Sequence, residues 1–397
     1  MKNFRSLLIT TISLVVSLLF LPAGALADHR DTSSSEIKSI TQNLYVGADL
    51  FRILSATSPE QIPVAVGQVF GTIQQTNFLQ RAESIAESIK DKKPDVIGLQ
   101  EVSLLRVQSP SDYFMGNPDA ARMIVYDYLQ ILLAALESRD LHYRVAAQVQ
   151  NVDVELPALV GFDPGTGTPL FNDVRLTDRD VILVREKIKS ADAVGVNFQT
   201  NLVVPVAGIP ITFTRGYTGV DVTVHDKTYR VVNTHLEVKG EGQVPFIQML
   251  QAQELTAVLA TETRPIVLLG DLNSPDDDVI DPVTGFVPPI LQFQWAGFTD
   301  AWVLGGEDDG GLTCCQSETL NNADSAYYER IDYVLYRPDS RSLYMQGIKV
   351  SADTFGDENE DKTVAGLWPA DHAGVFARIK SKVKRRHHPE RRFAQLH

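Results

Sequence analysis

Cysteine is nearly absent from this sequence of 397 residues, and the two that occur, Cys314 and Cys315, are adjacent. Two neighbouring cysteines cannot join distant parts of a fold, so a framework of disulfides is excluded. A pair of buried thiols is the favoured interpretation, with a vicinal disulfide and a covalent dimer as alternatives. Two sulfurs without a second pair also make a poor structural zinc site.

Basic residues are scarce as well, with 36 Lys and Arg against 50 Asp and Glu and a formal net charge of −14. Proteins that bind duplex nucleic acid usually present a basic surface, because phosphate contacts dominate their affinity. The basic block of this chain is 380–392, where seven Lys or Arg accompany Glu390. We expect residues 380–397 to form a disordered, solvated tail, with attachment to nucleic acid or to an anionic membrane as the alternative.

Long apolar runs are confined to the beginning of the chain. Met1 to Arg5 is a basic start, Leu7 to Leu21 is apolar, and Ala25-Leu26-Ala27 is a small-x-small pattern before polar residues. This arrangement is typical of a secretory signal peptide, and the apolar core is short for a permanent membrane anchor. We expect cleavage after Ala27 and a soluble mature protein in the periplasm or the medium.

The most informative stretch runs from Arg264 to Ser274, where a continuous apolar run ends in Gly270 and Asp271 and is followed by Asn273. A run this short, flanked by Pro and Gly, predicts a strand that is covered on both faces. Alternation along a strand places Asp271 and Asn273 on the same side. In isolation, such a pattern would be explained by a strand and a turn.

Other strand-like runs carry polar residues in a comparable way. In chain order they present Asn43 in 40–44, Glu101 in 95–101, His235 in 229–236, Asp332 in 330–335, and Asp371 with His372 before a last apolar strand. This ordered set resembles the endonuclease/exonuclease/phosphatase superfamily, the fold of DNase I, abasic-site endonucleases, bacterial sphingomyelinases and inositol polyphosphate 5-phosphatases. The resemblance extends from Ile40 to Ala377.

The resemblance implies an α/β (α+β) fold, a DNase I-like four-layer α/β/β/α sandwich of two packed mixed sheets. We expect one catalytic domain over residues 28–379, because no Pro/Ser-rich linker divides the chain. Periodicity and turn residues predict helices over 78–90, 123–137 and 248–261 and a hairpin that turns at His225-Asp226. In the helix 78–90 the charged residues are expected on the face opposite the apolar ones, toward solvent. Residues 148–178 are expected to form an inserted hairpin or loop near the active face, and 274–294 a further insertion beside it.

The resemblance also implies metal-dependent hydrolysis of a phosphoester. In this chemistry a divalent cation neutralises phosphoryl oxygens while an oriented water attacks in line. Glu101 is the implied principal ligand of Mg²⁺, with Mn²⁺ or Ca²⁺ as alternatives, and Asn43 and Asp371 assist it. Arg215 and Asp180 are candidates for contacts with the substrate phosphate, although many relatives have Asn at the position of Asp180.

The implied catalytic residues act around this cation. Asp271 orients or deprotonates the attacking water, and Asn273 holds phosphate. His235 donates a hydrogen bond to the phosphoryl group or protonates the leaving oxygen. His372 is oriented by Asp332, because a histidine held by a carboxylate keeps one tautomer and becomes more basic.

Substrate class follows from charge rather than from these residues. The acidic chain favours a secreted phosphodiesterase or phosphatase for a small or lipid-borne phosphoester over an enzyme for long DNA. A secreted DNase I-like endonuclease is the alternative. The partners to consider beside the substrate are nucleic acid and a membrane, the latter contacted through the basic tail. A binding protein that has lost its chemistry is disfavoured, because the motif residues are intact. Nothing indicates an obligate protein partner.

Overall fold

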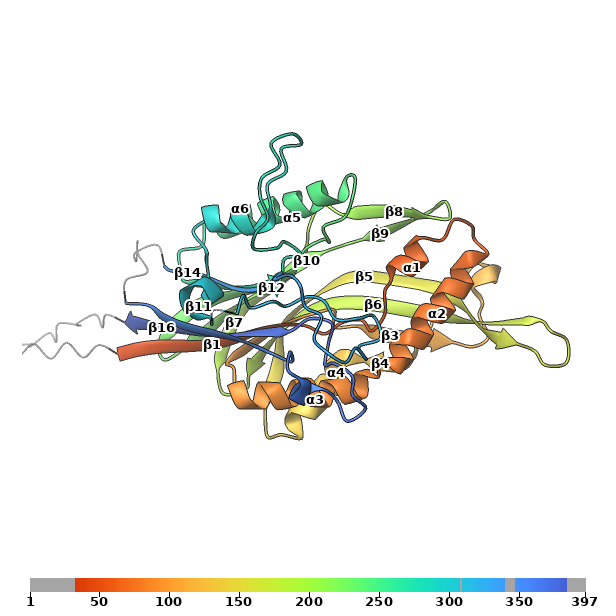
Figure 1. Cartoon of the computed structure of the whole chain (residues 1–397), viewed down its shortest axis with the longest axis horizontal. Helices are drawn as coiled ribbons and strands as arrows, with labels where there is room; N and C mark the ends of the chain where they lie inside the picture. The colour runs from red at the N-terminus through yellow and green to blue at the C-terminus, as the bar shows by residue number, and fades with distance from the viewer. Residues whose placement is uncertain (1–32, 308, 340–346, 384–397) are drawn as a thin grey trace, which may run out of the picture. The chain divides into compact units, whose positions relative to one another are not determined.

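Most apolar runs become strands of two mixed sheets in the computed structural model, which describes residues 33–307, 309–339 and 347–383 (Figure 1). The predicted signal peptide lies outside the described residues and stays a prediction. The predicted tail also lies largely outside them, but its first four residues, 380–383, belong to the last strand. No helix in the described part of the chain is long and apolar enough to cross a membrane.

The first sheet has the order β15-β16-β1-β2-β6-β3-β4, and β5 pairs with β6. β1 and β2 are parallel, whereas β2, β3 and β5 each run antiparallel to β6. The bounds are β1 Ser33–Asn43, β2 Val96–Gln100, β3 Leu104–Gln108, β4 Met123–Asp127, β5 Tyr143–Phe162, β6 Pro169–Arg185, β15 Lys349–Phe355 and β16 Gly374–Val383.

The second sheet has the order β13-β14-β12-β11-β10-β7, with β11 and β12 parallel. A separate hairpin of β8 and β9 stands beside it. The bounds are β7 Lys189–Asn197, β8 Leu202–Val206, β9 Ile209–Phe213, β10 Gly216–Val224, β11 Lys227–His235, β12 Ile266–Asp271, β13 Thr299–Asp300 and β14 Asp332–Arg337.

The two sheets pack face to face over an apolar core. Val96 and Ile182 of the first sheet belong to one buried cluster with Val231 and Val267 of the second. Gly98 of β2 allows a close approach, because a Cβ there would lie 2.6 Å from Asn233 Oδ1. Burial on both faces explains why these strands are continuous apolar runs in the sequence.

Helices cover the outer faces, with α3 and α4 on one side of the strands and α5 and α6 on the other (Figure 1). The predicted four-layer α/β/β/α arrangement is therefore confirmed. The bounds are α1 Phe51–Leu54, α2 Gln61–Gln75, α3 Phe78–Lys92, α4 Tyr128–Glu137, α5 Val244–Leu259, α6 Pro289–Trp295 and α7 Ala301–Gly305, with short 3-10 helices at Tyr113–Met115 and Asn359–Asp361.

One local prediction needs correction. The helix predicted over 123–137 begins at Tyr128, because Met123–Asp127 pairs with β3 as a strand and leaves Met123 and Ile124 exposed. Of the hairpin or loop predicted over 148–178, the structure has the hairpin, formed by the long strands β5 and β6. The turn at His225-Asp226 joins β10 and β11 as predicted.

Candidate active site

Strand register brings the predicted polar residues to one edge of the two sheets. His235 pairs with Asp271 across the parallel strands β11 and β12, and Asp271 pairs with Asp332 across β12 and β14. In the other sheet Asn43 pairs with Gln100, so Glu101 follows directly beside it. Parallel strands end at the same edge, and the polar ends of both sheets therefore meet.

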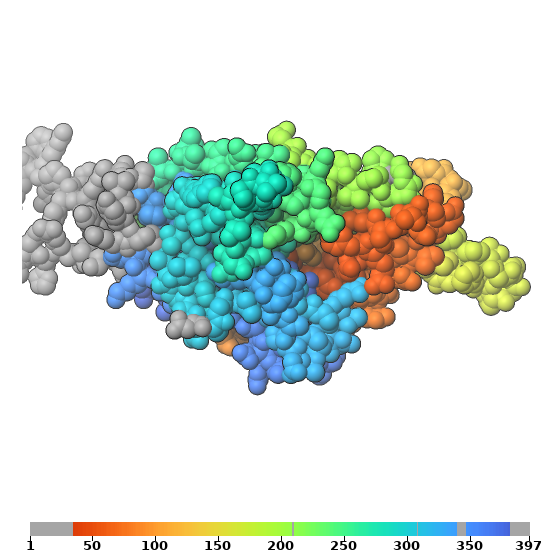
Figure 2. Space-filling view, turned by 45° about the horizontal axis from the view of Figure 1, so that its top comes forward, coloured from red at the N-terminus to blue at the C-terminus, as the bar shows by residue number. Residues whose placement is uncertain are grey.

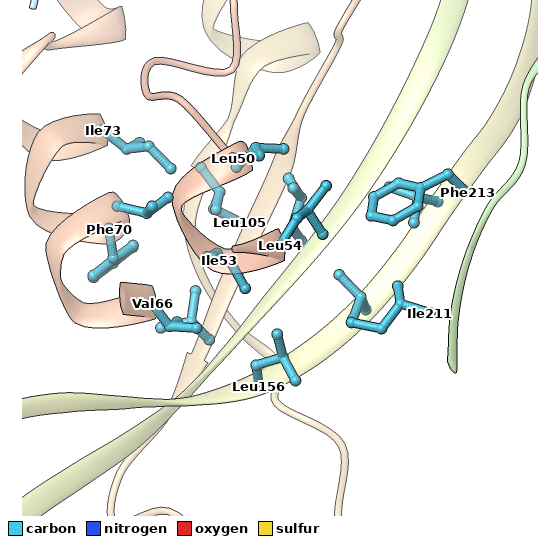
Figure 3. A pocket seen from close by; sticks show the side chains of 15 residues that line it. Leu50, Ile53, Leu54, Val66, Phe70, Ile73, Leu105, Leu156, Ile211 and Phe213 are labelled. Carbon is cyan, nitrogen blue, oxygen red and sulfur yellow. The ribbon is translucent and has the colours of Figure 1, made fainter. Parts of the chain in front are cut away.

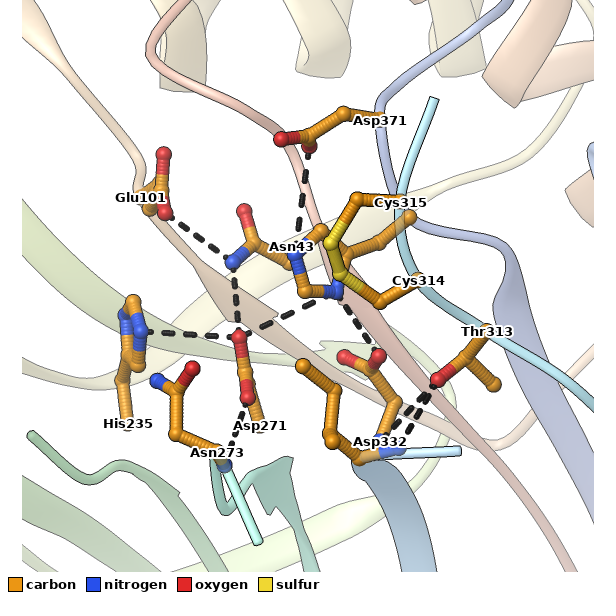
Figure 4. Close-up of a disulfide and its surroundings, with 12 residues drawn as sticks. Asn43, Glu101, His235, Asp271, Asn273, Thr313, Cys314, Cys315, Asp332 and Asp371 are labelled. Carbon is orange, nitrogen blue, oxygen red and sulfur yellow. Dashed lines mark hydrogen bonds and ion pairs between the residues drawn. A yellow bond between two sulfur atoms is a disulfide. The ribbon is translucent and has the colours of Figure 1, made fainter. Parts of the chain in front are cut away.

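Asn43 joins the two sheets through its side chain (Figure 4). Its Nδ2 donates to Glu101 Oε1 over 3.0 Å and to Asp271 Oδ2 over 3.1 Å. Its Oδ1 accepts a hydrogen bond of 2.9 Å from the backbone N of Tyr45. Asn43 is fully buried, so it fixes the relative positions of the two carboxylates.

The carboxylate of Glu101 is held by an unusual backbone conformation. The φ angle of Glu101 is +53°, in the left-handed region that costs a non-glycine residue about 1–3 kcal/mol. The backbone N of Val46 donates to Glu101 Oε2 over 2.7 Å and, with Asn43, keeps the carboxylate in place. Such strain is maintained only where surrounding contacts determine the conformation.

His372 lies among three carboxylates. Its Nδ1 is 2.8 Å from Asp332 Oδ2 and 3.8 Å from Asp271 Oδ2, and its Nε2 is 4.0 Å from Asp371 Oδ1. Burial lowers the pKa of His372, but Asp332, Asp371 and Asp271 outweigh burial and hold that pKa well above its usual range. These carboxylates favour the protonated ring, and Asp332 orients it through Nδ1, as the resemblance implied for the pair.

His235 has the opposite protonation state. Its Nδ1 is 3.0 Å from Arg215 Nη1, and because a guanidinium only donates, this Nδ1 accepts. The ring proton then lies on Nε2, which is 3.5 Å from Asp271 Oδ2. Burial and the charge of Arg215 lower the pKa of His235 well below its usual range. His235 is thus a neutral hydrogen-bond donor at the site.

Arg215 contacts both His235 and Glu237, and its contact with the substrate phosphate stays a prediction. Its Nη2 is 3.4 Å from Glu237 Oε1. Burial lowers the pKa of Arg215, but Glu237, Asp178 and Asp180 outweigh burial and raise it. Glu237 was not predicted as a site residue, although it follows His235 by two positions in the sequence.

Asp180 belongs to a second buried polar group. Asn151 Nδ2 donates to Asp180 Oδ2 over 2.9 Å and to Asp178 Oδ2 over 3.1 Å. Burial and the neighbouring Asp178 raise the pKa of Asp180 well above its usual range. Asn151 was not predicted as a site residue, because it reaches Asp178 through a register shift in the β5–β6 pairing.

Asn273 supports Asp271. Its backbone N donates to Asp271 Oδ1 over 2.9 Å, and its Nδ2 donates to the Leu236 carbonyl over 3.0 Å. The φ angle of Asn273 is +48°, a conformation that asparagine tolerates better than most residues. Both oxygens of Asp271 are therefore oriented by amides, from Asn273 and from Asn43.

A match to the endonuclease/exonuclease/phosphatase family extends over residues 73–372. The chain belongs to this family. Members of the endonuclease/exonuclease/phosphatase family are typically metal-dependent phosphoester hydrolases and generally use a divalent metal. Among curated proteins, none matches the chain in sequence.

Solved structures share the fold at low identity. A family protein from Beutenbergia cavernae is 19% identical, with 88% of this chain and 72% of that chain covered and a TM-score of 0.51. A family protein from Bacteroides thetaiotaomicron is 13% identical. The match covers 88% of this chain and 100% of that chain, with a TM-score of 0.50. Truncated Caenorhabditis elegans TDP2 is 16% identical. The match covers 87% of this chain and 97% of that chain, with a TM-score of 0.46.

The site fits the divalent cation that the family generally uses. Burial and Asp332 raise the pKa of Asp271 to about 7, and burial and Glu101 raise that of Asp371 to about 7. Within the described chain, Asp332 Oδ1 and Asp371 Oδ1 are buried without a hydrogen-bond partner. Carboxylates that repel one another and have unpaired oxygens are suited to hold a hard divalent cation.

The described His, Cys, Asp and Glu side chains include two groups whose ligand atoms lie within 4.8 Å of one another. One group is Asp271, Asp332 and His372, and the other combines His372 with the two cysteines. Glu101 belongs to neither group, since its carboxylate contacts Asn43 instead. The predicted ligands Glu101, Asn43 and Asp371 thus lie at the site but do not form its tightest cluster.

The two cysteines are joined as a vicinal disulfide, so the expectation of buried thiols was wrong (Figure 4). The number and adjacency of the two cysteines in the sequence do not show whether the backbone brings their sulfurs together. Here Cys314 forms β-bridges with both Glu329 and His372, and the backbone N of Gln316 donates to the Asp371 carbonyl over 2.9 Å. The disulfide segment therefore lies directly against the loop of His372.

Arg81 is another site residue that the sequence did not reveal. Its fully buried guanidinium donates to the carbonyls of Leu44, Tyr45 and Pro369, over 2.7, 3.0 and 3.1 Å. These bonds connect the loop after β1 with the segment that leads to Asp371. Arg81 lies on the predicted helix 78–90, whose charged residues we expected on the solvent face.

Proposed function

We propose that this chain is a metal-dependent phosphodiesterase or phosphatase for a small or lipid-borne phosphoester. The observation that carries the proposal is the buried group of carboxylates at one edge of the sheets with two histidines, His372 among the carboxylates and His235 beside Arg215, whose pKa values are shifted in opposite directions. Catalytic groups whose environments set different protonation states at neutral pH are typical of acid–base chemistry. The family and its fold support hydrolysis of phosphoesters.

Each residue then has a defined task. Glu101, with Asn43 and Asp371, would hold Mg²⁺, which would neutralise negative charge on the phosphoryl oxygens. Asp271 accepts a proton from the attacking water, since its pKa of about 7 suits proton transfer near neutral pH. His235 donates a hydrogen bond from Nε2 to a phosphoryl oxygen, and His372 donates from Nε2 toward the phosphate.

Substrate size is inferred from charge. The chain has a formal net charge of −14, and its basic block lies at the end of the sequence. A long polyanion needs several phosphate contacts along its length, whereas a single phosphoester needs only the local site. We therefore place small and lipid-borne phosphoesters before plasmid DNA, and we place the enzyme outside the cytoplasm on the pattern of residues 1–27.

A substrate panel tests this proposal. Bis-p-nitrophenyl phosphate, sphingomyelin, RNA and plasmid DNA are each offered with Mg²⁺, Mn²⁺, Ca²⁺ or EDTA, to wild type and to Asp271→Asn. We expect metal-dependent cleavage of a small or lipid-borne diester that EDTA and Asp271→Asn abolish. Efficient nicking of plasmid DNA at moderate salt, with every small phosphoester untouched, would instead establish the nuclease alternative.

A further inference from the structure

An apolar pocket lies between helices α1 and α2 and strands β3, β5, β6 and β9 (Figure 3). All 15 side chains that line it are Leu, Ile, Val or Phe. The cavity between them has a volume of about 70 Å³ and is partly open to solvent. Ligand pockets usually combine an apolar lining with a few polar groups that orient the ligand, and this pocket has none.

The pocket begins where the metal-binding end of the site stops. Leu50 lines the pocket four residues after Val46, whose backbone N holds Glu101. Leu105 lines it four residues after Glu101 itself. Extended chain advances about 3.3 Å per residue, so the Cα atoms of Leu50 and Leu105 lie within roughly 13 Å of those of Val46 and Glu101, respectively.

Three more segments connect the pocket to the site in the same way. Val152 directly follows Asn151, and Phe213 precedes Arg215 by two residues. Leu176 precedes Asp178 by two residues in β6. Five separate segments thus carry pocket-lining residues one to four positions from residues of the site or of the polar group of Asn151 and Asp178, which places the pocket next to the site along the chain.

The pocket has a closed floor and an accessible rim. Val69, Ile73 and Leu105 are buried, whereas Leu54 of α1 and Ile211 of β9 are only half-buried. Figure 2 shows the surface of α1 and α2, in orange, directly beside that of β8 and β9, in yellow-green. The backbone N of Ala207 donates to the Ala56 carbonyl over 3.3 Å and ties the two sides of the rim together.

We propose that this pocket binds one alkyl or acyl chain of the substrate while its phosphate lies at Glu101 and Asp271. The inference rests on the proposed function, because it assigns the substrate class of that same site. A nucleobase, sugar or charged headgroup would lose hydrogen bonds with water in such a lining and regain none. A hydrocarbon chain has no hydrogen bonds with water to lose, and its binding removes apolar surface of the chain and of the pocket from water.

Chain-length dependence tests the inference with p-nitrophenyl alkyl phosphodiesters, from methyl to octyl, kept below their micelle concentrations in Mg²⁺. We expect kcat/KM of wild type to rise about three- to fourfold per added methylene until the pocket is filled. The gain should appear in KM rather than in kcat, since the chain binds equally in the ground and transition states. Rates independent of chain length would overturn the inference.

Matched variants locate the effect. Leu54→Gln and Ile211→Trp place a polar or bulky group at the half-buried rim, and we expect the ratio of octyl to methyl kcat/KM to fall about tenfold or more. Phe51→Gln on the same helix and Val203→Trp on the adjacent strand are the controls, since these residues are 57% and 53% exposed and do not line the pocket. An unchanged ratio in both rim variants, or an equal loss in the controls, would contradict the inference.

Binding without catalysis separates this inference from the proposed function. Cis-parinaric acid, a fluorescent fatty acid, is titrated into the whole protein in EDTA. We expect saturable binding to wild type that Leu54→Gln and Ile211→Trp each weaken about tenfold. This result without hydrolysis of any phosphoester would support the pocket and reject the proposed function. Absence of binding to wild type would reject the pocket whatever the hydrolytic activity.

Discussion

Single residues set the charge of the two buried histidines. His372 Nδ1 faces Asp332 and the ring is cationic, whereas His235 Nδ1 faces Arg215 and the ring is neutral. The sequence implied the first pair through family motifs. It could not reveal the neutral state of His235, because that state depends on Arg215, which lies on the loop before the adjacent antiparallel strand.

Loss of Asp332 and of His372 is expected to be non-additive. The two side chains are 2.8 Å apart, and residues that act as a unit share one contribution to catalysis. The double variant Asp332→Ala/His372→Ala should therefore be about as slow as His372→Ala alone in single-turnover experiments. Rate losses that multiply would show that the two residues act independently.

The buried carboxyl of Asp178 predicts a pH-dependent stability. Burial and Glu101 raise its pKa from 3.8 to about 6, so ionisation costs the folded state stability as pH rises from about 4 to 6. Asp178→Asn removes this cost, and we expect the variant to be about 1–3 kcal/mol more stable than wild type at pH 8 but similar near pH 4. Urea unfolding in EDTA at the two pH values measures the difference. A variant that is less stable at pH 8 would show that the charge of Asp178 is favourable.

At the scale of elements, the strand ends were predictable and the connections between them were not. An apolar run that stops at Asp271 signals a buried strand with a polar end in any context. By contrast, the Met123–Asp127 strand has apolar residues that also fit a helix, and only its pairing with β3 decides the outcome. The contact of Asn151 with Asp178 likewise depends on a register shift that composition does not encode.

Close packing of the two sheets makes β2 sensitive to a single methyl group. A Cβ at Gly98 would lie 2.6 Å from Asn233 Oδ1 and 2.9 Å from Leu269 Cβ, so we expect Gly98→Ala to destabilise the fold by about 1–3 kcal/mol. Gly71→Ala is the control, because a Cβ there meets nothing within 4 Å and alanine favours a helix. Thermal unfolding should separate the two variants. Equal stability would mean that the sheets can move apart without cost.

At the scale of the whole molecule, two sheets each contribute half of the site. Asn43 and Glu101 come from the first sheet, and His235, Asp271 and Asp332 come from the second. The four-layer fold and this convergence followed from the family resemblance. The apolar pocket did not, because its lining is drawn from six elements whose apolar residues look like ordinary core in the sequence.

Dependence of activity on Mg²⁺ in Glu101→Gln tests the central claim most directly. The substitution keeps the shape of the side chain and removes one negative charge from the proposed cation site, so Mg²⁺ should bind more weakly while the fold persists. With bis-p-nitrophenyl phosphate as substrate, we expect the variant to need at least about tenfold more Mg²⁺ for half-maximal activity. A folded variant with wild-type activity at limiting Mg²⁺ would contradict the assignment of this site.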